Sequence, residues 1–183
     1  MLHVLNSTHS ALDRFSEWTG RCIAWLTLVM VLVTFAIVVL RYAFNTGWIA
    51  MQESVLYLHS FVFMLGGAYT LKHNGHVRVD IVYRSLGARG RAWVDLLGTL
   101  LLLMPVCGFI LWSSWDYVWD AWELREGSRE AGGLPWVYVL KTTLLLMPLL
   151  LILQGIAEIM RNLLVLRGAR LHARPYGHEA DTL

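Results

Sequence analysis

The chain has 183 residues, of which 57% are hydrophobic and only 15% are charged, and its mean hydropathy is +0.53. The charged residues gather in a few clusters and leave long uncharged runs, which excludes an ordinary soluble domain and predicts an all-α integral membrane protein. The two cysteines, Cys22 and Cys107, stand apart in apolar runs, which excludes a disulfide framework and a zinc site built on paired cysteines.

Residues 1–21 precede the first apolar run. Ser10 to Asp13 has the form of a capping box, and Leu12, Phe15 and Trp18 recur at three-residue spacing. The pattern predicts a short amphipathic helix or tail on the cytoplasmic membrane surface. An alternative, that this segment simply extends the first spanning helix, fits the same residues.

Four membrane spans follow, at about 22–40, 54–71, 96–115 and 136–157. Each is close to the ~20 residues that an α-helix needs to cross the hydrocarbon region. Backbone groups in lipid must be satisfied within their own segment, so the spans are predicted to be helices. We expect a four-helix membrane domain over 22–161 and a cytoplasmic tail over 162–183. The glycines at 66, 67 and 98 predict close helix approaches, and Pro105 and Pro148 predict kinks.

Orientation follows from the distribution of Lys and Arg. Eleven of the 15 lie in the N-terminal tail, the central segment 72–95 or the C-terminal segment. The positive-inside rule therefore predicts that both termini and this central segment are cytoplasmic. Seven aromatic residues gather at the opposite side, as in an interfacial belt: Trp48, Trp112, Trp115, Trp119, Trp122, Trp136 and Tyr138.

Two loop segments have internal order. In the central segment Val79, Val82, Tyr83 and Leu86 follow helical spacing, which predicts a second amphipathic helix at the membrane surface. Beyond the third span, the spacing of Trp112, Trp115, Trp119 and Trp122 predicts that its helix continues past the bilayer. Residues 130–135 form a turn signature before the fourth span.

The spans are almost bare of ionisable groups, whereas a membrane protein that transports or catalyses alone normally carries them there. His59 and Gln154 are the main polar exceptions, and no other span offers the second histidine that haem ligation usually needs. No nucleophile lies beside a base, no phosphate-binding glycine loop occurs, and His73 with His76 alone makes a poor metal site. The sequence predicts no catalytic, metal, cofactor or nucleic-acid site. Arg41 and Glu53 are expected to pair and to fix the first helical hairpin.

Several segments together resemble the small membrane subunit of tripartite ATP-independent periplasmic (TRAP) transporters. They are Arg41 to Asn45, Gln52-Glu53, His76 to Asp80, Glu126 to Ser128, Gly133 to Pro135, Lys141 and Gln154-Gly155. The segment His76-Val77-Arg78-Val79-Asp80 is the most specific. Gln52 departs from the pattern, because an acid is expected before Glu53.

The resemblance implies a small accessory or scaffold permease subunit in the bacterial inner membrane. Its partners would be a large multi-span membrane subunit, which holds the substrate and cation sites, a periplasmic binding protein that delivers an organic acid, and membrane lipids. Structural or subunit-interface roles are implied for Arg41, Asn45, Glu53, His76, Arg78, Asp80, Ser128, Gly133, Pro135, Lys141 and Gln154. A docking face for the binding protein is implied at Trp119, Trp122, Arg125 and Arg129.

Two other classes remain open on the residues alone. An independent, self-associating four-helix transporter or channel would need a polar pathway, for which His59, Gln154 and scattered hydroxyls are the available groups. A haem-bearing membrane anchor of a redox enzyme would need a second axial ligand.

Overall fold

The computed structural model describes residues 2–76, 83 and 85–168, with side chains from residue 14 onward. Across these residues the chain is helical and no strand occurs, which confirms the predicted all-α class. The helices are α1 (Leu2–Ala43), α2 (Ile49–Lys72), α4 (Ala88–Gly98), the π-helical turn η1 (Thr99–Leu103), α5 (Met104–Glu123) and α6 (Val137–Leu166).

Four helical rods are long and apolar enough to cross a membrane: Arg14–Ala43, Ile49–Lys72, Ala88–Glu123 and Val137–Leu166. The third rod consists of α4, η1 and α5 in direct succession. The predicted spans 22–40, 54–71 and 96–115 lie inside the first three rods. Trp136, the predicted start of the fourth span, is the N-cap residue of α6. The four predicted spans are therefore confirmed as helices.

Two predictions about the ends of the spans have different outcomes. The helix α1 runs unbroken through Arg21, so residues 2–21 extend the first spanning helix, which is the alternative arrangement considered above. The predicted helical continuation of the third span is confirmed, since α5 ends only at Glu123. The predicted amphipathic helix from Val79 to Leu86 lies mostly outside the described residues.

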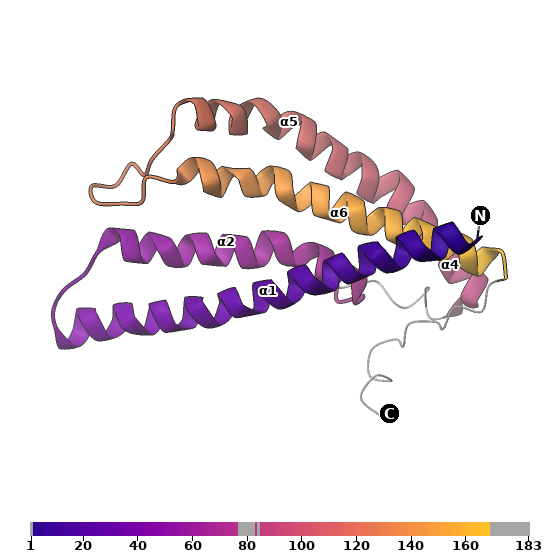
Figure 1. The fold of residues 1–183 in the computed structure, drawn as a ribbon, viewed down its shortest axis with the longest axis horizontal. Helices are drawn as coiled ribbons and strands as arrows, with labels where there is room; N and C mark the ends of the chain where they lie inside the picture. Colours follow the sequence, from indigo (N-terminus) through magenta and orange to yellow (C-terminus); the bar gives the residue numbers. More distant parts are fainter. Residues whose placement is uncertain (1, 77–82, 84, 169–183) are drawn as a thin grey trace.

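The helices lie side by side in one layer, in the order α5, α6, α2 and α1 (Figure 1). Away from the two short loops, 44–48 and 124–136, the long helix α1 crosses towards α6. Among the described helices α6 has the most neighbours, because it contacts α1, α2, α4, η1 and α5. The core is consequently a stripe along α6, and the outer faces of α1 and α5 are exposed. We call the end with the two short loops the two-loop end.

Small residues make the closest helix contacts. Ala68, Ala92, Ala121 and Ala157 are each at least 96% buried. In lipid, helices associate through van der Waals packing and interhelical hydrogen bonds, and small side chains let the backbones approach. The prediction that helices approach closely at Gly66 and Gly98 is wrong, because a Cβ at either position would meet no atom within 4 Å.

Two other glycines mark the tight crossings. A Cβ on Gly20 would overlap the ring of Tyr69 on α2. A Cβ on Gly155 would lie 2.9 Å from both Leu103 Cδ2 and Met104 Cε, at the crossing of α6 with η1 and the start of α5. These two positions, which lie in α1 and α6, fix the approach of their helices to neighbouring rods.

The π-helical turn η1 precedes Pro105. The Met104 N–H donates to the Thr99 carbonyl five residues earlier, one residue further back than in an α-helix. Proline lacks the N–H that would bond to the Leu101 carbonyl, and its ring would crowd that carbonyl in a regular helix. The wider turn relieves this conflict next to the crossing with Gly155. The third rod therefore changes helix type next to Pro105, while the kinks predicted at Pro105 and at Pro148, which lies inside α6, stay predictions.

Replacing Gly20 by alanine tests the crossing of α1 and α2. A helical Gly→Ala change normally stabilises a protein by about 0.5–1 kcal/mol, but here the methyl group overlaps Tyr69. We expect Gly20→Ala to destabilise the purified protein by roughly 1–3 kcal/mol, the usual cost of overpacking. The measurement is thermal unfolding in mild detergent. Gly108→Ala is the control, because its Cβ would meet nothing within 4 Å, and equal shifts for the two variants would contradict the assignment.

Candidate functional site

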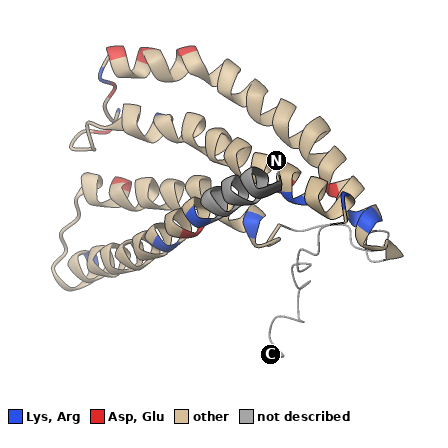
Figure 2. Cartoon of the chain, turned by 45° about the vertical axis from the view of Figure 1, so that its right-hand side comes forward, with Lys and Arg blue, Asp and Glu red and all other residues tan. Residues whose placement is uncertain are grey.

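Charged side chains gather towards the two ends of the helical layer and leave the middle of α2, α5 and α6 free of charge (Figure 2). At each end, polar groups from different helices bond to one another. The described residues hold no group of three or more His, Cys, Asp or Glu side chains that could bind a metal. The candidate site is therefore a set of interhelical polar contacts, and it is most developed at the two-loop end.

Glu53, one turn into α2, joins the two helical hairpins. One carboxylate oxygen accepts a hydrogen bond from the Ser128 hydroxyl, and the other accepts one from the Leu134 N–H at 2.6 Å. Both donors belong to the loop between α5 and α6. Hydrogen bonds to an ionised carboxylate are roughly twice as strong as neutral ones. Glu53 thus holds this loop against the start of α2.

The loop 124–136 is folded so that it can reach Glu53. The Ser128 N–H donates to the Leu134 carbonyl at 2.9 Å, and the Glu130 N–H donates to Ser128 Oγ at 3.1 Å. Gly133 passes so close that a Cβ would overlap Ser128 and lie 2.8 Å from Glu53 Oε1. Pro135 packs near Gly127, whose Cβ would lie 3.4 Å from its Cα. Any larger residue at Gly133 would displace the Glu53 carboxylate.

Lys141, one turn into α6, ties the same loop to α5. Its ammonium group pairs with the Glu126 carboxylate and lies 3.8 Å from the ring centroid of Tyr117 on α5. The Lys141 side chain is 14% exposed and that of Glu126 is 30% exposed. A partly buried ammonium group is stable in such a place when a carboxylate and an aromatic face surround it. We call Glu53, Glu126, Ser128, Gly133, Leu134 and Lys141 the loop clasp.

The four predicted docking residues divide into two kinds. Trp122 donates from Nε1 to Thr142 Oγ1 at 2.9 Å and packs edge-on against Tyr138, with 4.7 Å between ring centroids. Arg125 lies over the same Tyr138 ring at 5.9 Å and has a φ of 47°, so it ends α5 in the left-handed conformation. Both brace the loop. All four residues are exposed; Trp119 donates from Nε1 only to Glu123 of its own helix, at 3.0 Å, and Arg129 forms no hydrogen bond or ion pair with a described residue.

The prediction of an ion pair between Arg41 and Glu53 is wrong. The Glu53 oxygens bond to Ser128 and Leu134, and no described contact joins Glu53 to Arg41. Asn45, with a φ of 50°, turns the chain after α1 so that the Phe44 and Thr46 N–H groups both reach the Leu40 carbonyl, at 3.2 and 3.0 Å. Asparagine tolerates this left-handed conformation better than most residues, which gives Asn45 a local structural role.

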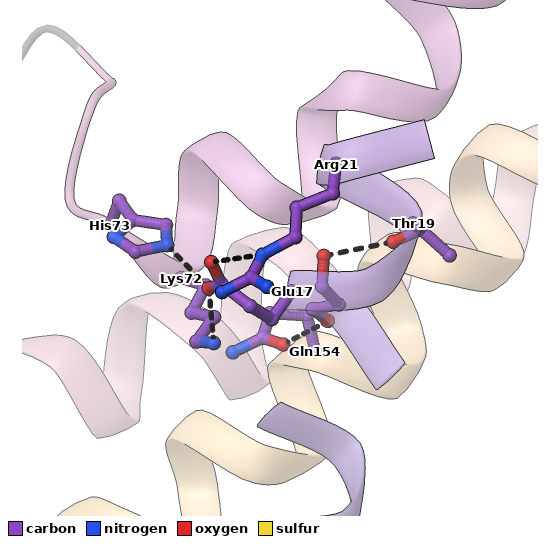
Figure 3. A network of polar contacts seen from close by, with 7 residues as sticks. Glu17, Thr19, Arg21, Lys72, His73 and Gln154 are labelled. Carbon is purple, nitrogen blue, oxygen red and sulfur yellow. Dashed lines mark hydrogen bonds and ion pairs between the residues drawn. The ribbon is translucent and has the colours of Figure 1, made fainter. Parts of the chain in front are cut away.

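At the opposite end of the layer, the polar contacts centre on α1 (Figure 3). Gln154, 1% exposed, accepts a hydrogen bond from the Ser16 hydroxyl at 2.6 Å. Glu17 pairs with Lys72 at 2.8 Å and with His73 at 3.1 Å. These contacts join α1 to α6 and to the end of α2.

The sequence analysis singled out Gln154 but missed its partner Ser16. It also missed the pair formed by Glu17 and Lys72 at the same end. Each pair is separated by more than 50 positions in the chain, so no local pattern indicates it. One available signal was that Glu17 lies in a helical segment with basic residues on both sides. The unbroken helix α1 carries this carboxylate to the end of α2.

Among the residues whose side chains are described, the histidines take no shared role. His76 Nε2 lies 3.3 Å from the Gly67 carbonyl, and Arg78 and Asp80 lie outside the described residues, so the implied role of this motif stays a prediction. His59 is exposed and stacks on Phe63 of its own helix, with 6.3 Å between ring centroids. The expected hydrogen bond of His59 at a helix interface is not formed with any described residue.

The fold and the loop clasp define the class as a multi-pass membrane protein with four spanning helices whose polar groups fasten helices together. Residues 30–165 match the family described as tripartite ATP-independent periplasmic transporters, DctQ component. The chain belongs to this family of small TRAP permease subunits, in agreement with the resemblance seen in the motif residues. It is accordingly a transporter component of the inner membrane.

Two curated relatives are similar to the chain. A protein of Haemophilus influenzae named as a TRAP transporter small permease is 34% identical over 94 residues, which is 51% of this chain and 57% of the relative. The C4-dicarboxylate TRAP transporter small permease protein DctQ of Vibrio cholerae is 27% identical over 118 residues, 64% of this chain and 50% of the relative. The chain thus spans about half the length of the curated relatives it matches. No solved structure matches it.

Removing the Glu53 carboxylate tests the loop clasp. In Glu53→Ala, the Leu134 N–H and the Ser128 hydroxyl lose their acceptor, and we expect a loss of about 1–3 kcal/mol in the free energy of unfolding. The measurement is thermal unfolding in detergent, together with protease cleavage in the loop 124–136. The matched control is Gln52→Ala on the same turn, whose side chain is exposed and whose loss should stay within about 0.5 kcal/mol. Unchanged stability and cleavage in Glu53→Ala would refute the role of the clasp.

Proposed function

We propose that this chain is the accessory, scaffold-forming small subunit of a TRAP transporter, paired with a large multi-span membrane subunit. The complex would carry out cation-coupled uptake of an organic acid delivered by a periplasmic binding protein. The observation that supports this most directly is how the chain uses its charged groups. Glu53, Lys141 and Glu17 all bond to other parts of the same chain, as a brace requires.

The exposed surface supports a partner in the membrane. The outer faces of α1, η1 and α5 carry large apolar side chains, including Trp25, Phe35, Leu102 and Trp112, each at least 67% exposed. A one-layer arrangement of four helices leaves more such surface than a closed bundle would. Lipid and the large subunit would cover it. A scaffold role needs no catalytic group, and we propose that the chain is not an enzyme.

The organic acid is proposed from the relatives. The Vibrio cholerae relative is named for C4-dicarboxylates, and TRAP systems are described as periplasmic transporters. In the proposed orientation the termini lie in the cytoplasm and the two-loop end lies in the periplasm. Trp119 and Arg129 would then face the binding protein, while Trp122 and Arg125 hold the loop that positions them.

Purification of the tagged chain from its native host in mild detergent tests the scaffold role. We expect one much larger hydrophobic partner at equal stoichiometry, measured by native mass spectrometry of the complex and its dissociated components. A homo-oligomer without a partner would instead favour an independent transporter or channel. A haem absorption band in the purified protein would favour the redox-anchor alternative.

A surface variant separates docking from assembly. Replacing Trp119 and Arg129 together by alanine should weaken uptake and binding-protein capture, because aromatic and arginine side chains dominate many protein interfaces. The mass of the membrane complex should stay unchanged, since both side chains are exposed. Asp116→Ala with Asp120→Ala, on the exposed face of α5, is the control for general surface change. Normal uptake in the Trp119 and Arg129 variant would place the docking face elsewhere.

A further inference from the structure

A polar pocket of about 340 Å³ lies at the two-loop end, between the end of α1 and the start of α2. Its lining consists of Arg41, Asn45, Thr46, Gly47, Ile49 and Gln52. The left-handed turn at Asn45 folds the short loop back, so that the first turn of α2 faces the last turn of α1. The loop clasp does not share these residues, and the pocket is separate from it.

Arg41 is the single charged residue in the pocket lining. Glu53, the nearest acid in the sequence, points its two oxygens at Ser128 and Leu134, and no described residue forms an ion pair with Arg41. Asn45 and Gln52 contribute side-chain amides, which can donate hydrogen bonds. An uncompensated guanidinium with amide donors beside it favours an anionic ligand with several oxygen acceptors.

The position of the pocket along the chain indicates which anion it meets. Arg41 is the first charged residue after the uncharged run 22–40, so it lies where the first span leaves the hydrocarbon. Tyr42, Phe44 and Trp48 flank it and are 83%, 67% and 61% exposed. Exposed Trp and Tyr side chains of this kind are typical of the membrane–water interface, where lipid phosphates lie.

We propose that the Arg41 pocket binds the phosphate group of a membrane phospholipid. The Arg41 guanidinium holds the phosphate oxygens, with Asn45 and Gln52 as neighbouring donors. The flanking aromatic residues lie at the level of the upper acyl chains. This site anchors the α1–α2 hairpin in the lipid leaflet, whereas the exposed side chains of Trp119 and Arg129 belong to the α5–α6 side. The inference does not depend on which substrate the transporter carries.

Lipid binding by the purified complex tests the pocket. The complex is stripped of lipid in neutral detergent and titrated with phosphatidylglycerol, and retained lipid is counted by native mass spectrometry. We expect Arg41→Gln to weaken the tightest binding event by about tenfold or more, the size expected for losing a charge-assisted hydrogen bond. Arg129→Gln removes the same charge from an exposed residue at the same end and should leave that event unchanged. Equal losses in the two variants would mean general attraction to anionic lipid and would overturn the proposal.

A second variant fills the pocket without changing the charge. A Cβ on Gly47 would meet nothing within 4 Å, so Gly47→Leu places its side chain in open space lining the pocket. We expect the same loss of phosphatidylglycerol, whereas Gly108→Leu on the exposed side of α5 should retain it. Undiminished binding in Gly47→Leu would refute the pocket as the site.

Two further measurements distinguish the source of the anion. Inorganic phosphate should compete only weakly, because it lacks the acyl chains that the flanking aromatic residues contact. Equal, Arg41-dependent binding of inorganic phosphate would overturn the lipid assignment in favour of a free anion. If Arg41→Gln instead lowers capture of the binding protein and leaves lipid retention intact, the pocket serves a protein carboxylate and the proposal is wrong.

Discussion

One carboxylate ties the two helical hairpins together at the two-loop end. Glu53 lies one turn into α2, yet both of its hydrogen-bond donors, the Ser128 hydroxyl and the Leu134 N–H, come from the loop that joins α5 to α6. Lys141 and Glu126 then connect that loop to the start of α6. The two hairpins would otherwise touch mainly where α2 meets α6. In a membrane, where helices gain little from excluding water, such charge-assisted bonds at the helix ends fix the register of one hairpin against the other.

The helix α6 is the element through which the layer is assembled. Its buried stripe contains both the small residues that permit close packing and the polar residues that reach α1, with Gly155 beside η1 and Gln154 against Ser16. Each of the other helices packs only one part of its surface against the rest of the chain. Their remaining faces are apolar, as expected for surfaces in contact with lipid or a partner subunit. Membership of the DctQ family gives this asymmetry a reason, because such a subunit works inside a larger transporter.

The spans, the helix class and the motif residues could be predicted because hydropathy, length and sequence spacing are local properties. Uncharged runs of about 20 residues between charged residues located all four helices. The partners could not be predicted, because Glu53 meets residues 75 and 81 positions away and Glu17 meets Lys72 from another helix. In the α1–α2 hairpin the charged residue nearest to Glu53 in the sequence is Arg41. Arg41 lines the pocket beside the 44–48 loop, whereas Glu53 bonds to Ser128 and Leu134. Likewise Gly66-Gly67 looked like a packing motif, while the tight crossings fall at Gly20 and Gly155.

The clasp also has a consequence for biosynthesis. Glu53 is translated long before Ser128 and Leu134. Its carboxylate therefore has neither of its hydrogen-bond donors until the loop before α6 has been made. The first hairpin can therefore enter the bilayer before the loop clasp exists. The clasp forms only when the loop 124–136 lies on the same side of the bilayer as Glu53. A chain that inserted with its second hairpin inverted would place Ser128 and Leu134 on the other side of the bilayer, where they could not bond to Glu53.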